Sequence, residues 1–244
     1  AFSFDDGFDI IKTGVKQVLD HHGIKATFFI TTACTDNKHL IWTNKLAAVI
    51  SRNSREVCVT RFNRLMAQLG MNLSVRNRWE IHGASKRWPM AKKEEITDAF
   101  WHLCDMPSID GYLQEHTPYF TQEDIKKLKQ EGHTIGLHTK THPVCPELSP
   151  DEISEEIIQP SSDLKKLYGL EKIYFSYPFG LRISPDLEKQ LFDQGVFEAA
   201  FGTSGMSKRG TPPYQLERTG IETGVVPKVF GETVMSTIRD IRGI

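Results

Sequence analysis

Short apolar runs alternate with amphipathic segments along much of the chain, and this pattern is typical of a parallel α/β protein. Residues 1–4 read as a short buried strand, residues 8–22 have helical spacing, and residues 26–31 form a continuous apolar and β-branched run. Such a run is expected for a strand that is covered on both faces. Strand, helix and strand in this order predict a βαβ unit with parallel strands. The residues expected on the core face of its helix are Ile11, Val15, Val18 and Leu19.

The alternation stops after the second strand, from about residue 39 to residue 118, where a helical pattern mixes charged and aromatic residues. We interpret this segment as a helical insertion. Its tryptophans favour ordinary core packing over a lid, a sugar-stacking wall or a dimer surface. The elements predicted after it are a helix starting with a capping box at residues 121–124 and ending near 132, a strand at 133–138, a helix at 149–168, a strand at 172–177, a helix at 184–194, a strand at 197–203, a weaker strand at 214–221 and a helix at 229–242.

Polar motifs follow three of the predicted strands directly. Asp5 and Asp6 come after the first strand, His138 and His142 end or follow the strand at 133–138, and the segment 178–180 (Pro-Phe-Gly) follows the next one. The carboxyl ends of the strands share one face in a parallel α/β barrel, and active sites lie on that face. We therefore expect these motifs to converge on one site.

Two imidazoles and a carboxylate are enough to hold a divalent metal ion with coordination positions left open. His138 and His142 are four residues apart, but the strand before them and the helix-disfavouring Pro143 predict a loop instead of a helix. The alternative is that the two residues bind no metal. His138 would then be a strand-end histidine whose hydrogen bonds are made within the protein, and His142 would be a surface histidine. The nearby Asp pair favours the metal site over that alternative.

The adjacent carboxylates of Asp5 and Asp6 repel each other unless a cation or a base role separates their titrations. We expect one of them to bind metal and the other to accept a proton from water, as a metal-assisted hydrolase requires. The alternative is that one of these two Asp residues is a helix N-cap and the other is its solvated neighbour.

The overall composition of the chain limits the classes of binding partner that we expect. The chain of 244 residues is 39% hydrophobic and 25% charged, with a net charge of -1, so neither nucleic acid nor an acidic membrane is expected as a partner. It contains no apolar stretch of membrane-spanning length. Its four cysteines lack C-x-x-C spacing, which favours reduced thiols and a cytoplasmic location, with disulfides left open. The first residue is not Met and already belongs to a predicted strand, so we expect the native N-terminus to be missing.

These motifs resemble those of the polysaccharide deacetylases, also called the NodB-homology domain or carbohydrate esterase family 4. The resemblance covers residues 1–33 and 119–202, and its motifs are FDDG at 4–7, GIKATFF at 23–29, GLHTKTHP at 136–143 and YPFG at 177–180. It implies a distorted (β/α) barrel of fewer than eight repeats. We therefore expect residues 1–244 to form one such domain, with about seven parallel strands and the helical insertion at about 39–118.

The resemblance also implies a role for each motif residue. The general base would be Asp5, and one divalent metal ion, zinc ahead of cobalt, nickel or manganese, would be bound by Asp6, His138 and His142. Substrate would be bound along the segment Tyr177, Pro178 and Phe179, with a backbone N–H near Phe179 helping to hold the oxyanion.

Two departures from the family pattern concern catalysis. The family commonly has an Arg two positions before the Pro of the third motif, where this chain has Ser176; Arg218 is the candidate replacement that would support Asp5, unless it forms a surface ion pair. No histidine follows His142 to match the family's late catalytic His. Three candidates for the general acid remain: metal-bound water, protonated Asp5, and a histidine of the insertion such as His82 or His116. Each of these two histidines is more simply interpreted as a surface residue.

The predicted activity is that of a metal-dependent carbohydrate de-N-acetylase, a hydrolase acting on linear amide C–N bonds. Metal-bound water would attack the N-acetyl group of an amino sugar or glycan with Asp5 as the base. The insertion and the late Arg218 resemble deacetylases of surface-glycan biosynthesis more than secreted chitin or peptidoglycan enzymes. The alternatives are a catalytically silent carbohydrate-binding domain and an amidase for a non-sugar small molecule; the oligomeric state is left open.

Overall fold

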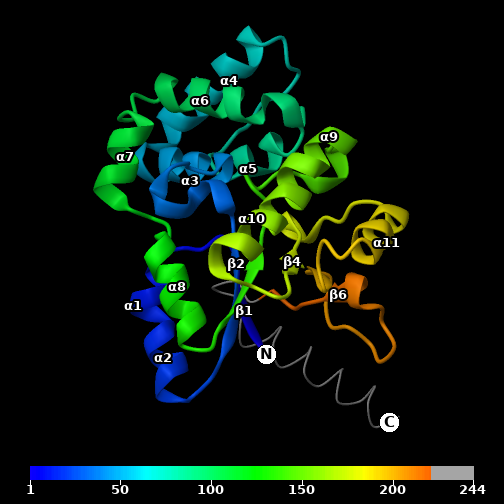
Figure 1. The fold of residues 1–244 in the computed structure, drawn as a ribbon. Coiled ribbons are helices and arrows are strands. Elements are labelled where there is room, and N and C mark those ends of the chain that lie inside the picture. Colours follow the sequence, from blue (N-terminus) through cyan, green and yellow to red (C-terminus); the bar gives the residue numbers. More distant parts are fainter. Residues whose placement is uncertain (221–244) are drawn as a thin grey trace, which may run out of the picture.

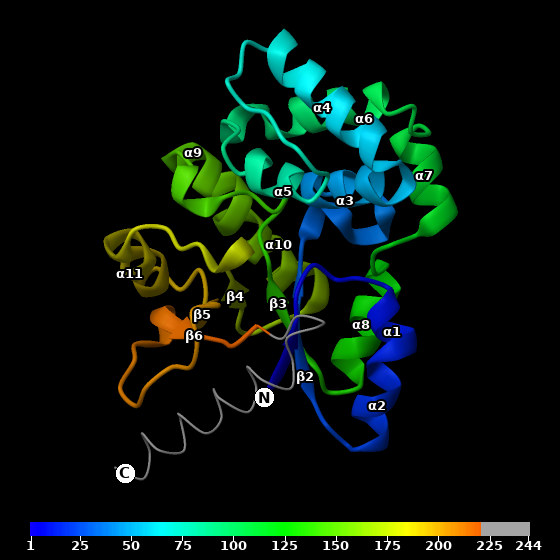
Figure 2. The ribbon, with the colours of Figure 1, turned by 180° about the vertical axis from the view of Figure 1, so that it is seen from behind.

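The computed structural model describes residues 1–220, and its centre is one parallel sheet of six strands in the order of the sequence. The strands are β1 (Phe2–Phe4), β2 (Ala26–Ile30), β3 (Thr134–Leu137), β4 (Tyr174–Ser176), β5 (Ala199–Gly202) and β6 (Leu216–Glu217). The sheet curls into a half-barrel with helices around it, so the predicted class, a distorted (β/α) barrel, is confirmed (Figures 1 and 2). About seven strands were predicted, and the described residues contain six.

The strand positions follow the predicted pattern closely, but the first strand is less buried than predicted. In β1, which pairs with β2 at one end of the strand order, Phe2 is 50% exposed. The central strands β2 and β3 are almost fully buried because both neighbours and helices cover them. The prediction of a buried first strand is therefore wrong, because a run of apolar residues does not reveal that a strand lies at an edge.

Helices flank the sheet on both sides (Figure 1). They are α1 (Ile10–Gly14), α2 (Lys16–His21), α8 (Gln122–Gln130), α9 (Pro150–Ile153), α10 (Gln159–Tyr168) and α11 (Pro185–Asp193). The capping box predicted for α8 is present, with Thr121 and Asp124 bonding each other's backbone N–H groups. The single helix predicted at 149–168 includes a π-helical segment, Ser154–Ile158, between α9 and α10.

The first predicted helix is divided at Val15 into α1 and α2. Ile11 and Leu19 are buried and Val15 is partly buried against the core, whereas Val18 is 56% exposed. The prediction that Val18 belongs to the core is wrong, because the two short helices do not continue a single straight apolar face.

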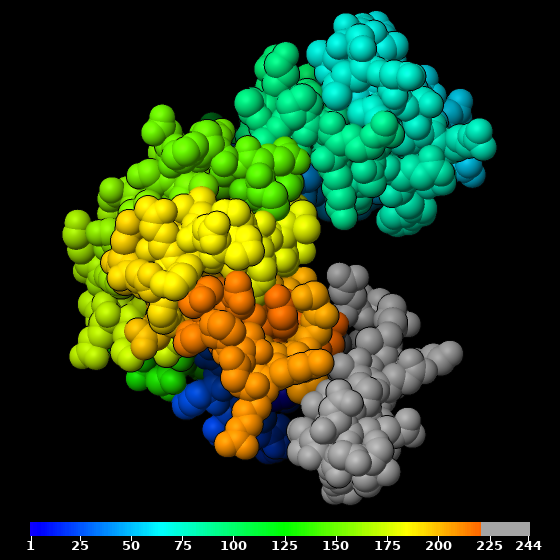
Figure 3. All heavy atoms as spheres, turned by 90° about the vertical axis from the view of Figure 1, so that its right-hand side faces the viewer, coloured from blue at the N-terminus to red at the C-terminus, as the bar shows by residue number. Residues whose placement is uncertain are grey.

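The segment predicted as an insertion is helical and extends from the barrel as a separate lobe (Figure 3). Its helices are α3 (Trp42–Arg52), α4 (Arg55–Gln68), α5 (Glu80–Ser85), α6 (Lys93–Leu103) and α7 (Ile109–His116). They enclose their own cluster of buried side chains, which includes Trp42, Trp88 and Trp101, while Trp79 is 68% exposed. Packing therefore explains three of the four tryptophans.

The helix predicted at 229–242 and the last residue of the strand predicted at 214–221 lie outside the described residues, so the assignment of residues 1–244 to one domain stays a prediction. Within residues 1–220, none of the helices combines the length and apolar character needed to span a bilayer. The four cysteines are free and buried.

Candidate metal and catalytic site

The structure brings the three predicted metal ligands together at the carboxyl ends of β1 and β3. Asp6 follows β1, and His138 and His142 belong to the loop after β3. The Nε2 atoms of His138 and His142 lie 3.5 and 3.4 Å from Asp6 Oδ1. The three ligand atoms all lie within 4.8 Å of one another, which is the arrangement needed to share one ion.

Neighbouring groups orient both imidazoles. The Nδ1–H of His138 donates to the Ser176 carbonyl at 2.7 Å, which leaves Nε2 facing Asp6. Metal-binding histidines are usually fixed by such a bond from their second nitrogen. The His142 ring meets the Phe179 ring edge to face at 4.7 Å, and the His142 carbonyl accepts from Trp42 Nε1 at 3.1 Å. The insertion therefore contributes to the placement of a candidate ligand.

Four non-glycine residues around the site have left-handed backbones: Asp6 (φ 69°), Thr139 (φ 65°), His142 (φ 65°) and Phe179 (φ 58°). Each such residue costs on the order of 1–3 kcal/mol unless its surroundings hold it in place. Strain of this kind clusters at active sites and ligand-binding sites, where it forms part of the mechanism. Its convergence here supports the site independently of residue type.

The donor set is suited to a cation. Asp6 Oδ1 is buried and has no hydrogen-bond partner within the described part of the chain. Burial raises the pKa of Asp6, the nearby His138 opposes this, and the charge of Asp5 adds to it. Burial also lowers the pKa of His138, and it lowers that of His142 to about 4, so both rings are neutral near pH 7. A buried carboxylate oxygen without a hydrogen-bond partner, placed between two neutral imidazoles, fits a divalent metal ion well.

Asp5 lies beside this trio but has different partners. Arg218 donates from Nη1 to Asp5 Oδ1 and from Nη2 to Asp5 Oδ2, both at 2.8 Å, and the Ser176 hydroxyl donates to Oδ2 at 3.2 Å. Burial on its own would raise the pKa of Asp5, but His138 and the bidentate Arg218 together hold it below the ordinary value. Asp5 is therefore kept ionised, and its Oδ2 lies 3.8 Å from His138 Nε2.

Of the two alternatives for Arg218, the structure has the contact with Asp5. Arg218 Nη2 also donates to Ser176 Oγ at 2.5 Å. The small Ser176 side chain thus leaves space for a guanidinium that arrives from another strand. In the sequence, Ser176 is visible only as a departure from the family pattern, and its position between Asp5 and Arg218 was not predicted.

The predicted substrate-binding segment is only partly at the surface. Phe179 is 36% exposed beside His142, but Pro178 is buried and Tyr177 is completely buried. The Tyr177 ring packs against Phe175 under the Arg182 guanidinium. The prediction that Tyr177 contacts substrate is therefore wrong for its side chain, because the residue after β4 still points into the core.

The insertion histidines that were considered as acids have other surroundings. His116 contacts Arg52 and stacks near the Tyr112 ring. His82 lies on α5, where burial lowers its pKa.

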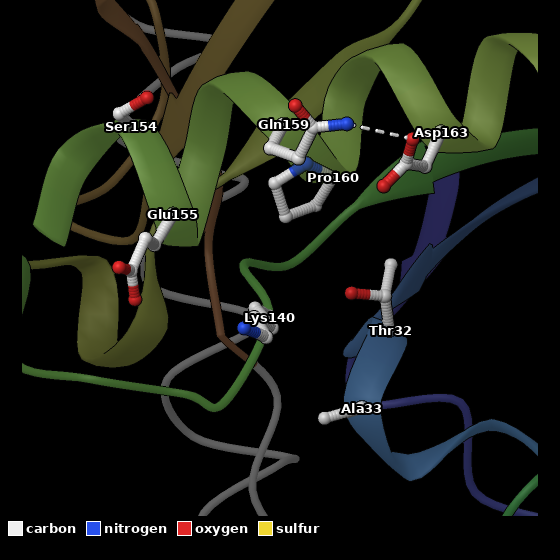
Figure 4. A pocket seen from close by; sticks show the side chains of 8 residues that line it. All are labelled: Thr32, Ala33, Lys140, Ser154, Glu155, Gln159, Pro160 and Asp163. Carbon is white, nitrogen blue, oxygen red and sulfur yellow. Dashed lines mark hydrogen bonds between the residues drawn. The ribbon is translucent and has the colours of Figure 1, made fainter.

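A pocket of about 470 Å³ lies next to the loop that carries the candidate ligands (Figure 4). It is lined by Thr32, Ala33, Lys140, Ser154, Glu155, Gln159, Pro160 and Asp163. None of the three candidate ligands lines it, so this pocket is separate from the metal site.

The sequence profile of the family described as polysaccharide deacetylase matches residues 1–196. The chain belongs to the polysaccharide deacetylase family. It is 34% identical over 56 residues to the peptidoglycan-N-acetylglucosamine deacetylase of Bacillus cereus, an alignment covering 23% of this chain and 20% of that protein. The chain spans less than half the length of the curated relatives that it matches.

Two solved structures share the fold at low identity. The Streptococcus pyogenes deacetylase PplD in complex with acetate has a TM-score of 0.54 and 16% identity, covering 95% of this chain and 68% of that one. IcaB from Ammonifex degensii has a TM-score of 0.54 and 18% identity, covering 94% of this chain and 70% of that one.

Proposed function

We propose that this chain is a metal-dependent hydrolase that removes an N-acetyl group from an amino sugar within a glycan. The observation that carries the proposal is the pairing of a ligand trio with a separate, guanidinium-held carboxylate beside it. Membership of the polysaccharide deacetylase family supports the reaction class.

Asp6, His138 and His142 would hold one divalent ion. The two imidazole donors favour zinc or nickel over manganese, and the family resemblance places zinc ahead of cobalt and nickel. When bound, such an ion lowers the pKa of water to about 7 and polarises the acyl carbonyl. The neutral state of both imidazoles is the state in which their nitrogens bind metal.

Asp5 acts as the general base. Its carboxylate is kept ionised by Arg218 and takes a proton from the attacking water. Ser176 and Arg218 orient the carboxylate, so that the oxygen beside His138 faces the ligand trio. The backbone N–H near Phe179, at its left-handed turn, helps to hold the tetrahedral oxyanion.

The proton held by Asp5 then passes to the leaving nitrogen as the C–N bond breaks, which yields acetate and a free amine. This assignment needs no late histidine, and His116 is engaged elsewhere by Arg52 and Tyr112. The family and the exposed Phe179 beside His142 support a glycan substrate over a small amide, since an aromatic face can stack on a sugar ring. The glycan would belong to surface-polysaccharide biosynthesis.

The test is acetate release from a panel of N-acetylated sugar oligomers and small amides, by protein whose metal content is measured by elemental analysis. We expect the protein to release acetate from the oligomers, to lose this activity when a chelator is added, and to regain it when zinc is supplied. Cleavage of the small amides alone would indicate an amidase. Metal retention and glycan binding without acetate would indicate a silent binding domain.

A further inference from the structure

The loop between the two candidate histidine ligands is tied to the π-helical segment Ser154–Ile158 through one side chain, that of Glu156. Glu156 Oε2 accepts from the backbone N–H of Lys140 at 3.0 Å and of Thr141 at 2.8 Å. Its Oε1 accepts from the Thr141 hydroxyl at 2.7 Å. Three donors of the five-residue segment 138–142 thus converge on one carboxylate, which is partly buried.

This loop needs external support because its own backbone is strained. Thr139 and His142 both have left-handed φ values, and Thr139 Oγ1 stabilises the turn by accepting from the His142 N–H at 3.0 Å. Left-handed non-glycine residues persist only where the surroundings over-determine them. Hydrogen bonds to an ionised carboxylate are stronger than those between neutral groups, so Glu156 is well suited to hold the middle of the loop.

The π-helical turn explains how a helix residue reaches this loop. A single wide turn changes the direction of the following side chains, and such turns are frequent at functional sites. Ile153 and Ile157 remain buried in the core while Glu156 faces the loop, and the backbone N–H of Lys140 is also 3.1 Å from the Glu156 carbonyl. In Figure 4 the helix carrying Ser154 and Glu155 passes over the loop that carries Lys140.

We infer that Glu156 is a positioning residue for the metal site: it does not touch the ion but fixes the loop that presents His138 and His142 to Asp6. The inference rests on the proposed metal site and extends it to a residue two elements away. Removing a support of this kind typically weakens metal binding about 10- to 100-fold.

The test compares zinc affinity, by competition with a chromogenic chelator, and the visible absorption of the cobalt-substituted protein. Glu156→Ala is expected to weaken zinc binding about 10- to 100-fold and to alter the cobalt spectrum. Glu156→Gln keeps an acceptor oxygen and should recover most of the affinity. Thr141→Val removes only the hydroxyl contact and should weaken binding a few-fold. The matched control is Glu155→Ala, which removes the neighbouring exposed carboxylate. Glu155 lines the same pocket as Lys140 but has no hydrogen bond to the loop within residues 1–220, so this variant should bind zinc like wild type.

Wild-type zinc affinity and cobalt spectrum in folded Glu156→Ala, or an equal loss in Glu155→Ala, would overturn the inference. If Glu156→Ala does not fold, the unchanged affinity of Thr141→Val would overturn it instead. Absence of zinc binding in the wild-type protein would contradict the proposed metal site itself. This result differs from zinc binding that is unaffected by the Glu156 substitutions, which would contradict only the role of Glu156.

Discussion

Arg218 and Asp5 come from the two ends of the strand order and meet in a bidentate ion pair. Asp5 follows β1, Arg218 follows β6, and both guanidinium contacts are 2.8 Å long. Arg218 Nη1 also donates to the Ser3 hydroxyl at 2.8 Å, and the guanidinium lies 5.0 Å from the centre of the Phe29 ring. One side chain thus spans the open side of the half-barrel and supports the proposed base.

Replacing Arg218 should affect the base without removing the metal. Arg218→Met loses the cation that holds down the pKa of Asp5, so that pKa rises and the carboxylate is protonated at a higher pH than in wild type. Because only the ionised form accepts a proton, the acidic limb of the kcat/KM profile should move to higher pH, and activity near neutrality should fall roughly 10- to 100-fold. Arg218→Lys keeps the charge but not the bidentate geometry. Its activity near neutrality should lie between that of wild type and that of Arg218→Met. An unshifted acidic limb with full metal content would contradict this role.

Asp5→Asn and His138→Ala should separate turnover from metal binding. The amide of Asn cannot accept the water proton, so kcat should fall about 10²- to 10⁴-fold while the metal content stays near wild type. His138→Ala removes one of the three ligands and should lose metal as well as activity. Elemental analysis together with acetate release distinguishes the two variants. Near wild-type turnover in Asp5→Asn would exclude Asp5 as the base.

Gly136→Ala should destabilise the protein from the centre of the sheet. A Cβ at this position would lie 2.6 Å from Cδ1 of Phe29 and 2.7 Å from the Tyr174 carbonyl oxygen. Overpacking of this kind costs about 1–3 kcal/mol of unfolding free energy, and a displaced Phe29 ring would also disturb Arg218 above it. Urea denaturation measures the loss. The control is Gly83→Ala on α5, where the new Cβ has nothing within 4 Å and stability should not fall.

His133 should make stability depend on pH. Its Nδ1 accepts from the Ala26 N–H at 3.2 Å, and burial, with help from Lys25 and Lys16, lowers its pKa from the ordinary 6.5. Well above pH 6.5 the ring is neutral in the folded and unfolded chains, so it adds no pH dependence there. Below pH 6.5 the unfolded chain binds the proton more readily, so stability falls, by at most about 1.4 kcal/mol per pH unit.

His133→Asn retains an acceptor oxygen without a titrating ring, so it should lose this part of the pH dependence. The measurement is urea denaturation of both proteins between pH 5 and pH 7.5. Parallel stability curves across that range would contradict the role assigned to His133.

The convergence of the three candidate ligands could be predicted because Asp6 and His138 lie just after strands and His142 lies in the loop after β3. Asp6, His138 and His142 each lie where a parallel sheet places the ends of its strands, so topology alone brings them close. The contact of Arg218 with Asp5 was left as one of two alternatives, because it depends on how far the sheet curls. The periodicity of the sequence does not encode that curvature.

Other features escaped prediction for local reasons. The burial of Tyr177 depends on the exact point at which β4 gives way to a turn, and a shift of one residue reverses the direction of a side chain. The exposure of Val18 follows from the division of the first helix at Val15. Glu156 was missed because a π-helical turn changes the face on which a helix residue lies, and a period of 3.6 residues does not anticipate it.

The ion pair between Asp5 and Arg218 joins residues that lie 213 positions apart in the sequence. Cleavage of the chain just before Arg218 would therefore remove the partner of the proposed base, while all three candidate metal ligands, Asp6, His138 and His142, would remain. Limited proteolysis in this region would thus separate the two halves of the candidate site without a point mutation.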